Sequence, residues 1–174
     1  MSTLAVNALQ AQTGTTVSLP TGHKIVGTDA ASIVAPGHII QQVYSINVSE
    51  ESTTSNTYVD TGLHLIITPK YSNSKILLLG SISLYQPTNN SVAAMSVKRG
   101  STIFGHSIWG LGYTYASAGG GIVNQVPINY LDSPSTTSAT TYRVMLSRGS
   151  TGTGTAYISV NSTPSSLTAL EIAQ

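Results

Sequence analysis

The chain has 174 residues and a formal net charge of +1, and only 7% of its residues are charged while 40% are hydrophobic. A typical soluble domain is about 25% charged, so most of the polar surface must come from the 25 Ser and 23 Thr residues. This composition provides no basic stripe for nucleic acid, no cysteine for disulfides or thiolate metal sites, and no apolar run of about 18 residues for membrane insertion.

Residues 1–37 differ from the rest of the chain. The stretch "TLAVNALQAQTGTTVSLPTGHKIVGTDAASIVAPG" has short apolar bursts broken by Gly, Pro and Thr. We expect an extended arm, with brief strands and one helical turn near residues 28–32. Ordering such an arm costs about 1–2 kcal/mol per residue in backbone entropy, so it must lie on another surface to become ordered.

From residue 38 onward the sequence alternates at period two, which is typical of β-strands. The segments are rich in Val, Ile, Thr and Tyr and are separated by Gly, Pro, Asn and Ser clusters. About nine short strands of this kind predict an antiparallel sandwich or jelly roll. Pro127 inside a strand pattern indicates an edge strand or a bulge. The predicted strands are 38–49, 61–68, 74–85, 92–97, 102–109, 122–131, 141–146, 155–160 and 167–172.

The alternation also predicts which side chains share a face. One face of each of the first three strands carries Ile40, Tyr44, Ile46 and Val48; Leu63, Leu65 and Ile67; and Ile76, Leu78, Ile82 and Leu84 around Gly80.

The third strand raises a question about its second face, which carries Leu77 and Leu79 before it changes to serine. Burying two leucines contributes roughly 3–6 kcal/mol, so an element of the same chain or a neighbouring subunit should cover them. A net charge near zero also favours association. We therefore expect a homo-oligomer with Leu77 and Leu79 at its interface.

Several phrases resemble known proteins. The N-terminal "TLAVNALQAQTGTTV" and "IVGTDAASIVAPGHIIQQVYS" resemble virion structural proteins of phages of cyanobacteria and other aquatic bacteria. The phrases "YVDTGLHLIITPKYSNSKILLLGSISL", "VKRGSTIFG", "NYLDSPSTTSATTYRVMLS" and "SSLTALEIAQ" resemble the head domains of phage tail-fibre proteins. Together they cover most of the chain, except for residues 106–121.

The resemblance implies a homotrimeric head at residues 38–174 and an N-terminal virion-attachment arm at residues 1–37. The apolar side chains of the arm would then contact a larger tail or capsid protein. These side chains are Leu4, Val6, Leu9, Val17 and Leu19.

Enzymatic chemistry has few candidate residues in this chain. It holds three Asp and three Glu, and acid–base catalysis needs a carboxylate pair or a tuned histidine in a pocket. Asp60 and His64 lie four apart on one strand face and could touch. However, "DTG" at residues 60–62 occurs once, whereas aspartic proteases need two such carboxylates. We interpret Asp60 as a turn or strand-start residue and expect no enzyme.

The four histidines, His23, His38, His64 and His106, show no H-x-H or H-x-x-x-H spacing. One of them could bind a metal on a three-fold axis, but we expect no metal and no cofactor.

The best binding candidate is "WGLGYTYASAGGG" at residues 109–121. Trp109, Tyr113 and Tyr115 lie in a glycine-rich stretch that we expect to form an exposed loop. Aromatic faces of this kind suit stacking on sugars or gripping a protein, although Trp109 could instead cap the core or a subunit interface. Tyr85, followed by "QPTNN", is a second candidate.

Taken together, the chain is expected to be all-β: a jelly-roll-like, homotrimeric sandwich preceded by an arm. The expected function is a non-enzymatic virion protein, a short tail fibre that binds a host-surface glycan or protein. The alternatives are a capsid decoration protein, a carbohydrate-binding lectin, and a polysaccharide depolymerase with a carboxylate pair in a groove.

Overall fold

The computed structural model describes residues 17–27, 33–117, 121–150 and 153–174. The chain divides into two compact units, Met1–Ile33 and Val34–Gln174. The boundary predicted after residue 37 therefore lies four residues beyond the division. The described part of the first unit, residues 17–27 and 33, has no strand or helix. The helical turn expected at 28–32 lies outside the described residues.

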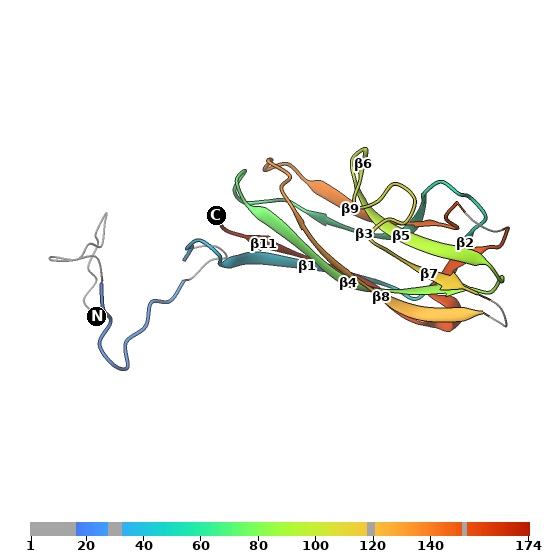
Figure 1. The fold of residues 1–174 in the computed structure, drawn as a ribbon. Coiled ribbons are helices and arrows are strands. Elements are labelled where there is room, and N and C mark those ends of the chain that lie inside the picture. Colours follow the sequence, from blue (N-terminus) through green and yellow to red (C-terminus); the bar gives the residue numbers. More distant parts are fainter. Residues whose placement is uncertain (1–16, 28–32, 118–120, 151–152) are drawn as a thin grey trace. The chain divides into compact units, whose positions relative to one another are not determined.

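The second unit is built from β-strands (Figure 1). Its one described helical segment is the short 3-10 turn η1, Val160–Ser162. No helix among the described residues is long and apolar enough to span a membrane. The strands are β1 Ile39–Asn47, β2 Glu51–Thr53, β3 Val59–Ile67, β4 Lys75–Gln86, β5 Ser91–Arg99, β6 Thr102–Ile103, β7 Gly112–Ala116, β8 Ile122–Asp132, β9 Thr140–Ser147, β10 Ala156–Ile158 and β11 Ser165–Ile172.

Two antiparallel sheets form a sandwich. Sheet A holds β1, β11, β4 and β8 in that order, with β10 and β2 continuing beside β4. Sheet B holds β3, β9, β5 and β7, with the short β6 also beside β5. The eight longest strands, four in each sheet, form a jelly roll, and the short β2, β6 and β10 extend it. The prediction of an all-β, jelly-roll-like sandwich is therefore confirmed.

The core lies between the sheets, where the predicted alternation places it. Leu63, Leu65 and Ile67 of β3 are buried, and so are the four inward aliphatic side chains of β4: Ile76, Leu78, Ile82 and Leu84. Gly80 continues this inward row. A Cβ there would lie 2.4 Å from the carbonyl oxygen of Ser166, so the close approach of β11 to β4 requires glycine.

Strand β1 corrects one prediction. The even positions from Ile40 to Val48 were expected to share a face, but a β-bulge between Ile39 and Gln41 shifts the register. An extra residue at a bulge reverses the side-chain alternation beyond it. Ile40 therefore points into the core, whereas Tyr44 and Ile46 are 55% and 53% exposed on the outside.

Two other predicted strands are wrong in part. The strand expected at 102–109 is limited to β6, because Gly105 and Gly110 adopt positive φ and the chain folds back between them. The strand expected at 155–160 ends at Ile158, since Ser159 and Asn161 are left-handed. Among the described residues Pro127 lies in β8, which pairs only with β4 and is therefore the predicted edge strand.

A buried ionic cluster joins the two sheets. Asp132 of β8 is 6% exposed. Its Oδ2 accepts a hydrogen bond from the Tyr142 hydroxyl of β9 at 2.6 Å and lies 2.7 Å from Nε of Arg99 in β5. Burial, followed by the bond to Asp132, raises the pKa of Tyr142 far above its usual range. Tyr142 therefore stays a neutral donor, and sheet A is tied to sheet B by one carboxylate.

The chain enters and leaves the sandwich at the same end. Gly37 N–H donates to the Ala173 carbonyl at 2.9 Å, and Ala173 N–H donates to the His38 carbonyl at 2.9 Å. The buried Glu171 closes this end, because its Oε1 accepts the backbone N–H of Lys70 at 2.8 Å and its Oε2 accepts Gln41 Nε2 at 2.5 Å. The turn between β4 and β5 lies at the opposite end (Figure 1).

Candidate functional site

Three aromatic residues form an exposed cluster on the outer face of sheet B, which we call the aromatic patch: Trp109, Tyr113 and Tyr115. The rings of Trp109 and Tyr113 are tilted by 38° with centroids 5.1 Å apart. Tyr115 lies two residues further along β7 on the same face, and its hydroxyl donates to Asn90 Oδ1 at 3.2 Å. The tyrosines are 52% and 45% exposed, and Trp109 is half-buried. The three residues therefore lie on one outer face, and their role in binding stays a prediction.

The prediction that all three lie in a loop is corrected. Tyr113 and Tyr115 belong to β7, which pairs with β5, so their alternation is that of a strand. Gly112 begins this strand, and a Cβ there would lie 2.4 Å from a methyl group of Val126. The glycine therefore allows β7 to approach β8 and does not mark a flexible loop.

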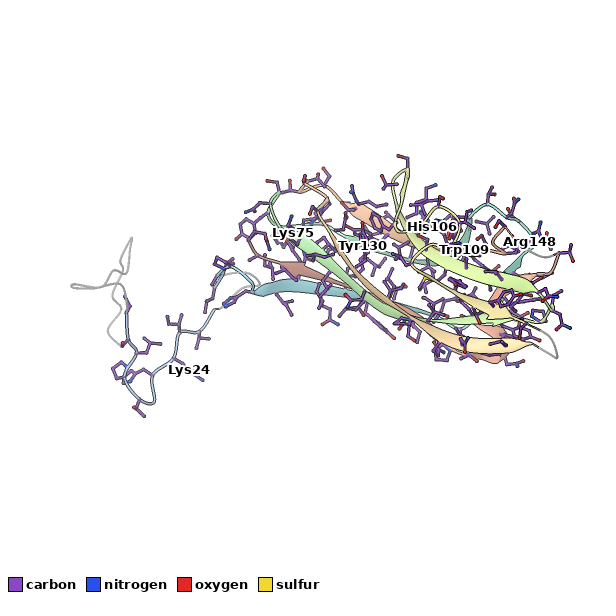
Figure 2. All side chains as sticks on the ribbon, viewed as in Figure 1. Lys24, Lys75, His106, Trp109, Tyr130 and Arg148 are labelled. Atoms are coloured by element: carbon purple, nitrogen blue, oxygen red, sulfur yellow. The ribbon has the colours of Figure 1, made fainter. Side chains whose placement is uncertain are left out.

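Trp109 is held by the segment 104–111, which we call the aromatic loop. His106 and Gly110 exchange backbone hydrogen bonds at 2.9 and 2.8 Å. His106 Nδ1 also accepts the backbone N–H groups of Ile108 and Trp109 at 3.1 and 3.2 Å. A Cβ on Gly110 would lie 2.0 Å from the Met95 carbonyl oxygen. The loop is therefore a tight turn pressed against β5, and Figure 2 shows His106 and Trp109 on it.

Tyr58, which precedes β3, also holds the aromatic loop in place. Its hydroxyl donates to the Ile108 carbonyl at 3.0 Å. Burial raises the pKa of Tyr58, while a side-chain hydrogen bond with Ser147 lowers it by less. The raised pKa keeps the hydroxyl protonated, so Tyr58 remains a donor to the loop. Neither Tyr58 nor His106 could be assigned this role from the sequence, since Tyr58 lies 50 residues from its partner Ile108.

Tyr85 does not belong to the aromatic patch. It lies on the outer side of sheet A, where its ring packs against Tyr157 with centroids 5.7 Å apart. The predicted set of four aromatic residues is therefore split between the two sheets, three on sheet B and one on sheet A.

Leu77 and Leu79 lie where the alternation of β4 predicts, on the outer face of sheet A. Both are half-buried. Strand pairing places Leu77 between Leu170 and Leu131, and Leu79 between Thr168 and Asn129. Their flanks are thus covered by neighbouring strands, while their tips point away from the sandwich. Their role in a trimer stays a prediction.

Among the described acidic side chains, those of Asp60, Asp132 and Glu171 make structural interactions. Asp60 Oδ2 lies 2.9 Å from Arg143 Nη1, and its Oδ1 accepts the Gly62 N–H at 2.9 Å. Asp60 is the second residue of β3, which agrees with its interpretation as a turn or strand-start residue. His64 Nδ1 instead contacts the Gly62 carbonyl at 2.8 Å. No pocket and no cluster of three His, Asp or Glu residues occurs among the residues that the structure describes.

Two of the five predicted attachment residues can be placed. Val17 and Leu19 are 45% and 47% exposed, whereas Leu4, Val6 and Leu9 lie outside the described residues. Ile25 and Val26 are also exposed, at 60% and 66%. The described part of the arm therefore presents several apolar side chains, and its role in attachment stays a prediction.

Comparison with known proteins gives distant structural likeness only. No family model and no curated protein matches the chain. The VP2 subviral particle of infectious bursal disease virus is 11% identical with a TM-score of 0.43, covering 87% of this chain and 43% of that one. The structure of the Gt strain of that virus is also 11% identical, with a TM-score of 0.42 and the same coverages. The chain thus spans about two fifths of the length of these proteins.

Proposed function

We propose that the protein is a bacteriophage virion structural protein, a short trimeric tail fibre whose head binds the host surface. The observation that carries this proposal is the polarity of the sandwich. The chain enters beside Ala173 at one end, and the aromatic patch extends from mid-sheet toward the other, where Tyr115 meets Asn90. Attachment and recognition would then use opposite ends of one small domain.

The fold is compatible with this proposal, because jelly rolls are common in viral proteins. Jelly rolls occur in viral capsid and lectin domains, and their closed sandwiches carry binding loops on a rigid frame. A fold alone does not define a function, so the proposal depends on the two surfaces added to it. These are the arm with its exposed Val17, Leu19, Ile25 and Val26, and the aromatic patch.

The location of the protein distinguishes the tail fibre from the alternative of capsid decoration. Antibodies against the purified protein, applied to phage particles and viewed by immunogold electron microscopy, should label the tail at a handful of trimers per particle. Labelling over the whole shell with hundreds of copies would instead establish the decoration protein. Absence of label and of the chain from purified particles would overturn both.

The aromatic patch gives a direct test of recognition. Trp109→Ala and Tyr113→Ala should each lower binding of the purified protein to host cells at least tenfold, because aromatic residues at the centre of an interface contribute about 2 kcal/mol or more. Tyr71→Ala is the matched control. Tyr71 is 43% exposed and lies in the β3–β4 connection, beside Glu171 at the opposite end. Equal loss of binding in the control would remove the patch from the proposal.

A carbohydrate-binding lectin is the second candidate, and the tilted Trp109–Tyr113 pair is the observation that favours it. Exposed aromatic rings stack on sugars as well as on protein surfaces. Binding to a glycan array that is lost in Trp109→Ala, together with absence of the chain from phage particles, would establish the lectin. Binding to protease-sensitive sites on the host cell would point to a protein receptor.

A further inference from the structure

The outer face of sheet A is rich in apolar side chains, interspersed with hydroxyl and amide groups, and it is built by four strands. Strand pairing aligns its outward side chains in rows across β1, β11, β4 and β8. We call these residues the sheet A outer face. They are Ile39, Gln42, Tyr44 and Ile46; Ser166, Thr168, Leu170 and Ile172; Lys75, Leu77, Leu79, Ser81 and Tyr85; and Val123, Gln125, Pro127, Asn129 and Leu131.

The rim of this surface is more exposed than its centre. Tyr44 and Ile46 on β1 are 55% and 53% exposed, and Leu131 and Val123 on β8 are 55% and 52% exposed. Leu77 and Leu79 lie between these two edges. Monomeric proteins rarely present large contiguous apolar patches to water, so this face is built to contact something.

The near absence of charged residues on the sheet A outer face indicates which partner would bind there. Lys75 is the one formally charged residue among the outward positions, and it lies at the end of the face, where its Nζ donates to Ser133 Oγ at 2.7 Å. The outward positions of sheet B include Asp60, His64, Lys98 and Arg143. A neutral surface of aliphatic, tyrosine and hydroxyl groups is complementary to itself, because opposing two copies brings no like charges together.

The size of the face also fits a protein partner. Four strands at about 4.8 Å spacing, each about 30 Å long, give a sheet plane of roughly 550 Å². The side chains project from this plane, so the accessible area is of the order of the roughly 800 Å² per partner in a stable interface. A short peptide or a small ligand would leave much of the apolar surface wet.

We propose that the sheet A outer face is the self-association surface of this protein and that one half of this face packs against the other half on a neighbouring copy of the chain, as a closed three-fold ring requires. The inference rests on the proposed trimer for the number of copies only. It extends the predicted interface from Leu77 and Leu79 to the edge residues Tyr44, Ile46 and Leu131, which the sequence did not single out.

The two sheets offer a matched pair of substitutions. Ile46 of β1 and Ile66 of β3 are both 53% exposed, but Ile46 faces outward from sheet A and Ile66 from sheet B. The full chain, measured by size-exclusion chromatography with light scattering, should have three times the 18.1 kDa mass of one chain. Ile46→Asp should reduce this to the monomer mass, and Ile66→Asp should leave the trimer intact. Circular dichroism establishes that both variants fold.

Cross-linking gives a second measurement that does not depend on disrupting the protein. Because the chain has no cysteine, an introduced thiol is unique. Ser81→Cys lies in the middle of the sheet A outer face, and Thr141→Cys lies beside Ile66 on sheet B. A flexible bismaleimide should join subunits of the first variant and not of the second.

The outcomes separate this inference from the proposed function. A monomeric unmodified chain, or equal dissociation by Ile66→Asp, would overturn it. So would dissociation by Val26→Asp with the trimer intact in Ile46→Asp, since the arm would then hold the copies together. An oligomer lost only in Ile46→Asp supports the inference even if the protein is absent from phage particles.

Discussion

The middle of the outer face of sheet B is covered by its own chain, whereas the two edge strands of the outer face of sheet A are exposed. On sheet B the outward residues Val92, Ala94 and Met145 are almost fully buried. The aromatic loop is hydrogen-bonded to β5 above them, and a Cβ on Gly149 would contact both Val92 and Trp109. On sheet A the outward residues of β1 and β8 stay about half exposed. The two outer faces therefore differ in how far the chain itself covers them.

The largest expected effect concerns the ionic cluster of Asp132, Tyr142 and Arg99, which joins the two sheets. Asp132→Asn leaves the Arg99 guanidinium without its carboxylate, and breaking such a buried pair costs about 3 kcal/mol. We expect a fall in melting temperature of about 6–12 °C. Asp60→Asn is the control, because the Asp60–Arg143 pair is exposed and contributes about 1 kcal/mol at most. Equal melting temperatures for the two variants in a thermal scan would contradict the role of the cluster.

The next largest effect tests how much the aromatic loop contributes to stability on the outer face of sheet B. Gly110→Ala places a Cβ against the Met95 carbonyl at a residue with φ of +62°, and we expect a loss of about 2 kcal/mol or more together with displacement of the loop. Fluorescence of Trp109, the single tryptophan of the chain, should shift to longer wavelength. Gly100→Ala has a similar φ of +56° but no atom within 4 Å, so it should lose about 1 kcal/mol with unchanged fluorescence.

A smaller effect appears at alkaline pH. The pKa of Tyr142 is raised in the folded protein above the ordinary value of 10.0. The stability that neutral Tyr142 contributes is therefore fully present below pH 10 and is lost progressively as the pH rises above it. Urea unfolding at pH 9 and about pH 11 should show a smaller loss for Tyr142→Phe than for the unmodified chain. Tyr113→Phe, on an exposed ring, should lose as much stability as the unmodified chain does.

The smallest expected effect, on the melting temperature, distinguishes the outer face of sheet A from that of sheet B most directly. If sheet A assembles, the melting temperature should rise by a few degrees with protein concentration, because association stabilises the folded state by mass action. Ile46→Thr should weaken this dependence, and Ile66→Thr should retain it. A melting temperature of the unmodified chain that is independent of concentration would mean that the two faces behave alike.

The sequence predicted which side chains of the regular strands point inward or outward. It missed the features that depend on contacts between residues distant in the sequence. The alternation in β3 and β4 located the core, and it placed Leu77 and Leu79 outside. It failed at β1, because the bulge after Ile39 has no signature in "HIIQQV". In β5 both faces are buried, and the covering of its outer face comes from a loop whose path depends on Tyr58 and His106.

The aromatic patch shows a similar limit. The composition of "WGLGYTYA" indicated a binding surface, and it also suggested a loop because glycines are frequent in loops. Gly112 is instead required by the packing of β7 against Val126, a contact between strands that period and composition do not reveal. Tyr85 was predicted as a second, separate binding candidate in a loop, and it lies instead in β4 of sheet A.

The meeting of Gly37 and His38 with Ala173 has a practical consequence for anyone handling the protein. A tag or a fluorescent protein appended after Gln174 would emerge beside the root of the N-terminal segment and at the far end from Tyr115. Protein labelled there should therefore keep the aromatic patch, the proposed recognition surface, unobstructed. Insertions in the β4–β5 turn should be avoided, because Asn90 of that turn accepts the hydrogen bond of Tyr115.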